Sequence, residues 1–492
     1  MTRDLRPDPR SPTLLEALVP VVALVLLVGL SFFLFGDAGA KGPNQVALIV
    51  ATMVAVAMAV LHGYRIADLT DAAVASVSSG IGAIFILFAV GALIGTWALS
   101  GTLLAMVYYG LRLLDPGSFY LTACALAAVV SFSIGSSWTV VGTIGVGLMG
   151  IAANMGLDPA IAAAAIISGA YFGDTTSPLS DSANLAAASA GAGLYDHIRE
   201  TLPTSLGALA LSLLVFWLLG TPGTADTSGK LAALSAATAT GPLMMAPLAV
   251  VIALALLRLP PFTTVFAGAL AGGVLAVIVA PERVAAFAAG GPDLPHALAL
   301  LKGVWLALAS GYVSTSGDAA IDALASRGGM ESMLPTIWLV MSAFAFGGIV
   351  EKTGVLERIV RPIAALAHRV GSLVAALVAS VVASNIVTAD QYLSIVLPGR
   401  MFRPEFERRG LAPIVLSRVV GAAATPTSAL VPWNSCGAYM AATLGVATVS
   451  YAPYAVFGMA SPLLAILFAA LGFRILRAPE AASARDEGAP FR

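Results

Sequence analysis

Long apolar runs recur along the whole chain, and they restrict its fold more than any other feature. Examples are residues 14–36, 206–219, 262–280 and 453–473. A helix needs roughly 20 mostly apolar residues to cross the hydrocarbon core of a bilayer. Counting these runs together with shorter runs interrupted by Gly or Ser, we predict an all-α polytopic membrane protein with about 11–13 transmembrane helices. The runs do not alternate, which argues against a membrane β-barrel.

The composition excludes several other classes of protein. Charged residues make up only 10% of this chain, whereas soluble domains carry about a quarter. The net charge of −1 says nothing about a nucleic-acid partner, but the sequence has no basic patch, so we expect no such partner. Cys124 and Cys436 lie in apolar surroundings without metal-ligand spacing, and we expect two buried thiols. The sequence contains no phosphate-binding loop, HExxH pair or Cys/His cluster, so we expect neither an enzyme nor a cofactor.

Basic residues predict how the chain is oriented in the membrane. Arg3, Arg6 and Arg10 precede the first apolar run, which is too long for a signal-peptide core and is expected to remain as a helix. We therefore expect a multi-pass protein of the cytoplasmic (inner) membrane, with both termini and the basic clusters at 358–369 and 400–409 on the cytoplasmic side. Histidines near the ends of the runs are expected to be solvated: His62, His197, His296 and His368.

Two hydrophobic blocks resemble each other, which indicates an internal duplication. Three pairs of landmarks recur at a nearly constant spacing: GTL at Gly101 with GVL at Gly354, SFSIGSSW at Ser131 with SNIVTADQ at Ser384, and TSPLSDSAN at Thr176 with TSALVPWNS at Thr427. Transporters are often built from inverted repeats whose broken helices or re-entrant hairpins meet at the core. We predict these parts: N-terminal helices 1–79, first transport repeat 80–219, polar linker 220–241, scaffold helices 242–332, second transport repeat 333–474 and cytoplasmic tail 475–492.

The stretch SGAYFGDTTSPLSDSANLAAA, residues 168–188, places Asp174 and Asp181 in apolar surroundings. Ser177 precedes Pro178, and a residue before proline avoids the α region, so we expect unwound backbone there. Unwound backbone within a membrane is tolerated only where protein or a water cavity supplies partners. Carboxylates, hydroxyls and freed carbonyls suit a small hard cation, so we predict Na⁺ bound by Asp174, Ser177, Asp181 and Thr388.

Polar residues elsewhere complete the predicted site. Asp390, in SNIVTADQY, is a further carboxylate in an apolar context, and such a residue is functional by default. We predict that the ion and proton site also includes Ser136, Ser137, Asn184, Asn385, Thr388 and Asp390. The acid-free stretch TPTSALVPWNSCGA repeats the signs of a broken helix with Pro426 and Pro432, and its Thr427, Trp433 and Asn434 are candidates for contacting an organic substrate.

Several of these motifs resemble the NhaC family of sodium/proton antiporters, within the broader ion-transporter superfamily. The stretches that carry the resemblance are GAYFGDTTSPLSDSANLA, SSWTVVGTIG, SRGGMESM, AFGGIVEKTGVL and TPTSALVPWNSCGA. The resemblance implies an inner-membrane secondary transporter that exchanges Na⁺ for H⁺, built from two inverted repeats with hairpins and broken helices. It also implies that organic acids are exchanged by some members.

Three functions compete. The first is Na⁺/H⁺ antiport, in which intramembrane aspartates bind Na⁺ and H⁺ alternately, because a carboxylate does not hold both well. The alternative is Na⁺-coupled transport of a small organic anion or amino acid, held by helix N-termini at the two breaks. The third is a membrane-embedded aspartyl enzyme, which needs two acids converging on one water. The duplicated pattern of breaks, with acids in only one copy, argues against an enzyme. We also expect a homodimer.

Overall fold

The structure is a computed structural model that describes residues 10–220, 228–290, 294–318, 322, 325–365 and 369–477. These residues form helices, and their only β pairings are isolated bridges joining Tyr312 to Arg327 and Leu411 to Arg477. The all-α prediction is confirmed. Three sets of predictions lie outside the described residues: those on Arg3 and Arg6, on His368, and on parts of the linker and tail at 221–227 and 478–492.

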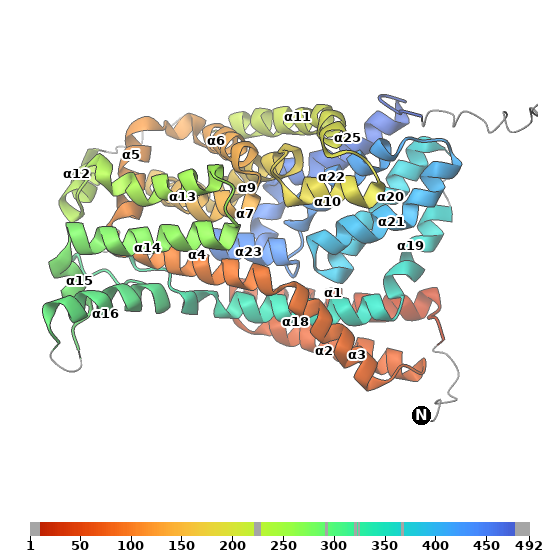
Figure 1. The fold of residues 1–492 in the computed structure, drawn as a ribbon, viewed down its shortest axis with the longest axis horizontal. Coiled ribbons are helices and arrows are strands. Elements are labelled where there is room, and N and C mark those ends of the chain that lie inside the picture. Colours follow the sequence, from red (N-terminus) through yellow and green to blue (C-terminus); the bar gives the residue numbers. More distant parts are fainter. Residues whose placement is uncertain are drawn as a thin grey trace, which may run out of the picture.

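Figure 1 shows the helices formed by the described residues. In chain order they are α1 (Leu14–Phe35), α2 (Pro43–Leu61), α3 (Ile66–Ser79), α4 (Ile81–Ser100), α5 (Thr102–Leu113), α6 (Phe119–Ile134), α7 (Ser137–Val140), α8 (Val146–Met155), α9 (Pro159–Thr176), α10 (Asp181–Ala190), α11 (Leu194–Leu218), α12 (Ser228–Ala237), α13 (Ala246–Leu256), α14 (Pro261–Val279), α15 (Pro281–Phe287), α16 (His296–Ala309), α18 (Leu334–Lys352), α19 (Val355–Ala365), α20 (Val370–Thr388), α21 (Gln391–Arg408), α22 (Pro413–Ser428), α23 (Ser435–Leu444), α24 (Thr448–Tyr451) and α25 (Val456–Ala470).

The outer helices have the length and composition of membrane spans. Within the described residues, 9 helices are long and apolar enough to cross a bilayer, and the bent pair at 448–470 raises this to 10. The larger number of spans that we predicted from the sequence also included shorter apolar stretches. Three shorter apolar stretches form helices of 10–17 residues among the described residues. Large apolar side chains such as Leu26, Phe33 and Trp305 are exposed on the surface, as expected where lipid replaces water. The protein is a multi-pass membrane protein.

Each half of the chain contains two consecutive helices that are separated by a short unwound segment. In the first half, α9 and α10 are separated by an unwound segment at 177–180; in the second, α22 and α23 are separated at 429–434. In each half a long helix packs on the first member of its pair: α6 on α9, and α20 on α22. These parallels support the predicted duplication. The inverted orientation of the repeats and their exact boundaries stay predictions.

A second type of break uses a residue with left-handed backbone. Gly135 (φ 81°) ends α6, and Ser136 then caps α7. Ala389 (φ 57°) ends α20, and Asp390 then caps α21. A positive φ is easy for Gly but unusual for Ala, which indicates that the surrounding packing imposes the bend at 389. Residues at both new helix N-termini, among them Ser136 and Asp390, line one cavity.

Pro426 differs from its predicted role. It lies inside α22, and the helix ends only at Ser428, so the unwound segment begins after this proline. A proline within a helix leaves the carbonyl four residues earlier without its usual N–H donor. Here the Ser461 hydroxyl of α25 donates to the Ala422 carbonyl at 2.8 Å. Because a neighbouring helix replaces the lost hydrogen bond, the proline is accommodated without unwinding the backbone.

Candidate functional site

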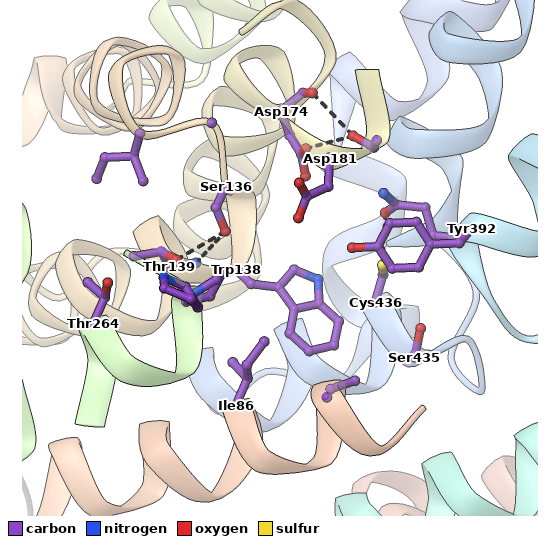
Figure 2. Close-up of a pocket in the computed structure, with 18 of the residues that line it drawn as sticks. Ile86, Ser136, Trp138, Thr139, Asp174, Asp181, Thr264, Tyr392, Ser435 and Cys436 are labelled. Atoms are coloured by element: carbon purple, nitrogen blue, oxygen red, sulfur yellow. Dashed lines mark hydrogen bonds between the residues drawn. The ribbon is translucent and has the colours of Figure 1, made fainter. Parts of the chain in front are cut away.

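A cavity of about 520 Å³ opens where the interrupted helices meet. Its walls come from the junction of α3 and α4, the loop between α13 and α14, and the starts of α7, α10, α21 and α23. Figure 2 shows Asp181 reaching into it from one side, Trp138 facing it from the opposite side, and Tyr392 and Cys436 from a third. Segments distant in sequence therefore build one pocket.

The Asp174 carboxylate in this pocket accepts hydrogen bonds from three side chains. Its side chain lies near the C-terminus of α9 and is buried, with 7% exposed. The Ser137 hydroxyl donates to Oδ2 at 2.6 Å, and the Ser180 and Ser182 hydroxyls each donate to Oδ1 at 2.7 Å. These serines come from α7, from the N-cap of α10 and from its first turn. One carboxylate therefore joins three helix termini.

The local sequence explains why these groups converge. The Ser177 N–H donates to the Gly173 carbonyl and ends α9, and the Ser177 hydroxyl then accepts from the Leu179 N–H at 3.2 Å. This compact turn contains Pro178, which cannot donate a backbone hydrogen bond. Ser180 begins α10 by accepting from the Ala183 N–H, as N-cap serines commonly do. The turn brings Ser180 and Ser182 back onto Asp174.

The other predicted aspartates also line the cavity. Asp181, the first residue of α10, is exposed and points into the open space (Figure 2). Asp390 is buried and accepts from the Leu393 N–H at 2.8 Å, so it also serves as the N-cap of α21. Ser136 lines the cavity too, where it caps α7 through the Thr139 N–H. Three carboxylates therefore face one space, with Arg258 the one basic residue in its described lining.

Several predicted ion ligands lie outside the lining. Ser177 forms the turn just described, and the Thr388 hydroxyl donates to the Ser384 carbonyl at 2.9 Å. Asn184 is exposed on α10. The Asn385 amide donates to the Ala424 carbonyl and the Thr427 hydroxyl, both at 2.9 Å. Of the four predicted Na⁺ ligands, Asp174 and Asp181 line the cavity, and the roles of all four stay predictions.

The three predicted substrate contacts form a network around the second break. The Trp433 indole N–H donates to the Ile386 carbonyl at 2.7 Å. Asn434 caps α23 through the Cys436 N–H at 3.0 Å and donates to the Asn385 carbonyl at 3.1 Å. Thr427 accepts from Asn385, as noted above. Their polar atoms are hydrogen-bonded within the protein. In this conformation these side chains therefore connect the ends of α20, α22 and α23 and do not line the cavity. Substrate contact by these residues stays a prediction.

Sequence reasoning missed other residues at the site. Ser180 and Ser182 had a local signal, because a serine just before a helix that starts with Asp is a typical N-cap. Trp138, Tyr392 and Arg258 had no such signal, since only the packing of remote helices brings them to the cavity. Trp138 is fixed by stacking on Tyr439, with ring centroids 4.1 Å apart and an interplanar angle of 12°.

A multi-pass helical protein whose interrupted helices meet around an acidic pocket has the architecture of a secondary transporter. Residues 13–221 and 169–473 match the Na⁺/H⁺ antiporter family. The chain belongs to this family, in agreement with the resemblance found in the motifs.

Three relatives illustrate the range of the family. The chain is 37% identical over 413 residues to the Na⁺/H⁺ antiporter NhaC of Alkalihalophilus pseudofirmus, covering 83% of this chain and 86% of that protein. It is 32% identical to the malate-2H⁺/Na⁺-lactate antiporter of Bacillus subtilis, covering 94% and 96%. It is also 32% identical to the arginine/ornithine antiporter of Halobacterium salinarum, covering 97% and 96%. These relatives are named as transporters, not enzymes.

Proposed function

We propose that the chain exchanges Na⁺ for H⁺ across the cytoplasmic membrane and that Asp174 binds the two in turn. The observation that carries this proposal is the Asp174 carboxylate surrounded by three serine hydroxyls at the edge of the cavity. Hydroxyl groups rotate and have lone pairs, so the serines that now donate to the carboxylate can turn their oxygens towards a cation. Carboxylate and hydroxyl oxygens are the ligands that small hard cations prefer.

The charge of the cavity supports a cation as cargo. Asp174, Asp181 and Asp390 face it together with only Arg258 among basic residues of the described lining. A concave site lined mainly by one sign of charge concentrates ions of the opposite sign. A bound Na⁺ favours the ionised form of a carboxylate, and a proton removes its charge, so the two compete for Asp174. That competition couples the two movements.

The function is tested by placing purified protein in liposomes with a pH gradient and adding single cations. We expect NaCl to collapse the gradient beyond any change in empty liposomes, and parallel additions of LiCl and KCl measure the selectivity. Choline chloride controls for chloride and osmotic effects. Failure of Na⁺ to move protons in either orientation of the gradient would overturn the proposal.

A second candidate function is Na⁺-coupled transport of a small organic ion that carries a carboxylate. Its support is the size of the cavity, since about 520 Å³ lies within the range of small-molecule pockets and exceeds the need of Na⁺ with a few waters of about 30 Å³ each. Arg258 adds the matching charge and has left-handed backbone (φ 62°), a conformation that costs about 1 kcal/mol for such a residue and that clusters at functional sites.

Replacing Arg258 with glutamine separates the two candidates. If organic acids are carried, Arg258→Gln lowers their transport about tenfold to a hundredfold, because a hydrogen bond between charged groups contributes about 1.5–3 kcal/mol. Na⁺-driven H⁺ movement without organic acid stays unchanged. The measurement is uptake of labelled malate, lactate and arginine into the same liposomes, with Arg258→Lys as the variant that keeps the charge. No uptake of any of them by the wild type would exclude these cargoes.

A further inference from the structure

A second group of buried polar side chains lies on α11, away from the cavity. His197, Thr201, Thr204 and Ser205 are completely buried, and Glu200 is 8% exposed. Their spacing places them on one face of the helix, which packs on α9, α22 and α25. The sequence had predicted a solvated His197. That prediction is wrong, because α11 continues as one helix from Leu194 and presents this residue to α22 rather than to the surface.

Many polar atoms of this group have no hydrogen-bond partner among the described residues. They are His197 Nε2, Glu200 Oε2, the hydroxyls of Thr201, Thr204 and Ser205, and Nε and Nη2 of Arg418 on the facing α22. Buried polar atoms without partners are rare, and each costs about 1–3 kcal/mol if it stays unsatisfied. Buried water molecules typically bind where several donors and acceptors lie together without other partners, so we expect water between these side chains.

Direct contacts connect the group to the protein surface on one side. Arg474, which follows α25 and is about one-third exposed, approaches Glu200 with 3.5 Å between Nη2 and Oε1. Its carbonyl accepts from Arg418 Nη1 at 3.2 Å. The charged groups of the described residues that face the group are therefore Glu200, Arg418 and Arg474. Asp196 and Arg199 lie on the exposed side of α11.

On the other side the group approaches Asp174. His197 Nδ1 is hydrogen-bonded to the Ser417 hydroxyl, and its ring lies against Gly421, beside Ala186 of α10. Ala186 is one helical turn, about 6 Å, from Ser182, and residues four apart lie on the same face. The Ser182 hydroxyl donates to Asp174 Oδ1. Ala186 therefore lies between the imidazole of His197 and the turn of α10 that carries Ser182.

We propose that Glu200 and His197, joined by buried water, form a second proton-binding site through which H⁺ passes between the surface at Arg474 and Asp174. The Glu200 carboxylate accepts a proton from surface water at Oε1, beside Arg474, and bridging water at Oε2 carries a proton on to His197 Nε2. His197 releases a proton through water and the Ser182 hydroxyl to Asp174, and the reverse sequence returns it. No other bond forms or breaks. This inference rests on the proposed Na⁺/H⁺ exchange and assigns its proton a route separate from the cavity.

The test compares two reactions of the same protein in liposomes. Exchange of labelled Na⁺ for Na⁺ needs the ion site and the conformational change but no proton, whereas Na⁺/H⁺ exchange needs all three. We expect His197→Gln and Glu200→Gln to lower Na⁺/H⁺ exchange about tenfold or more, as for loss of a positioned acid–base group, and to leave Na⁺/Na⁺ exchange within about twofold. Glu200→Asp, which still binds a proton, restores most of the H⁺ flux.

Ser212→Ala is the matched control, because Ser212 is a buried hydroxyl on the same helix that bonds only to its own Ala208 carbonyl, at 2.7 Å. It should change neither reaction. A parallel loss of both exchanges in the His197 and Glu200 variants would indicate a structural role and overturn the route, as would no loss of either. If wild-type protein performs Na⁺/Na⁺ but not Na⁺/H⁺ exchange, the proposed function itself fails, whatever the variants do.

Discussion

Asp174→Asn reduces Na⁺-driven H⁺ movement to below about 1% of the wild-type rate. The amide has nearly the shape of the carboxylate, and the surrounding serines can rotate to accept from its NH₂ group, so the fold tolerates the change. It removes the negative charge that binds Na⁺ and the group that takes a proton. A hundredfold loss of rate corresponds to about 2.7 kcal/mol, which is close to the free energy that one hydrogen bond to a charged group contributes. The measurement is the initial rate of dye-reported gradient collapse in liposomes.

Asp158→Asn provides the matched control at the opposite end of α9. Asp158 accepts from the Ala160 N–H at 2.8 Å as the N-cap of that helix, and asparagine caps equally well. Exchange by this variant should equal that of the wild type. Persistent exchange in Asp174→Asn would move the ion site to Asp181 or Asp390 and disprove the role given to Asp174.

Gly169→Ala separates α6 from α9 and lowers the melting temperature by several degrees. A Cβ at Gly169 would lie 2.1 Å from the Cys124 carbonyl oxygen and 2.9 Å from the Ala128 nitrogen, and these backbone atoms cannot move independently of α6. Gly169 and Gly173 form a GxxxG pair, which lets two membrane helices approach closely. Overpacking of this kind costs about 1–3 kcal/mol. Asp174 lies just over one turn away, so exchange should fall as well.

The measurement is thermal unfolding of the purified protein in detergent, followed by loss of the monodisperse peak in size exclusion. Gly29→Ala is the control, because an added Cβ there meets nothing within 4 Å. It should melt within about one degree of the wild type. An unchanged melting temperature in Gly169→Ala would show that α6 can shift to accept a methyl group, and the close approach would then be no constraint.

The membrane fold could be predicted because its causes are local. Runs of apolar residues define helices in a bilayer whatever their neighbours are, and Ser177–Pro178 favours a break in any context. The prediction at Pro426 was less successful, since only the distant Ser461 decides whether that proline interrupts α22. The same limit applies to His197, whose burial depends on the packing of α11 against α22.

The candidate site was predicted only in part for a related reason. Asp174, Asp181 and Asp390 stand out because charge is rare in an apolar chain, and all three line the cavity. The hydroxyls that contact Asp174 could not be chosen from the many serines and threonines nearby, because most such groups bond to their own helix. Arg258 comes from a loop in the middle of the chain, and no repeat or motif connects it to the aspartates.

The two interrupted helix pairs have similar lengths but treat their polar groups differently. At the first, the Asp174 carboxylate accepts hydrogen bonds from three serine hydroxyls. At the second, Asn385, Thr427 and Asn434 bond to one another and to backbone carbonyls, which leaves little for a ligand to replace. A duplicated architecture therefore does not mean a duplicated cargo site. A substitution at the first break therefore changes a charge that faces the cavity, whereas one at the second break changes the packing that holds two helix ends together.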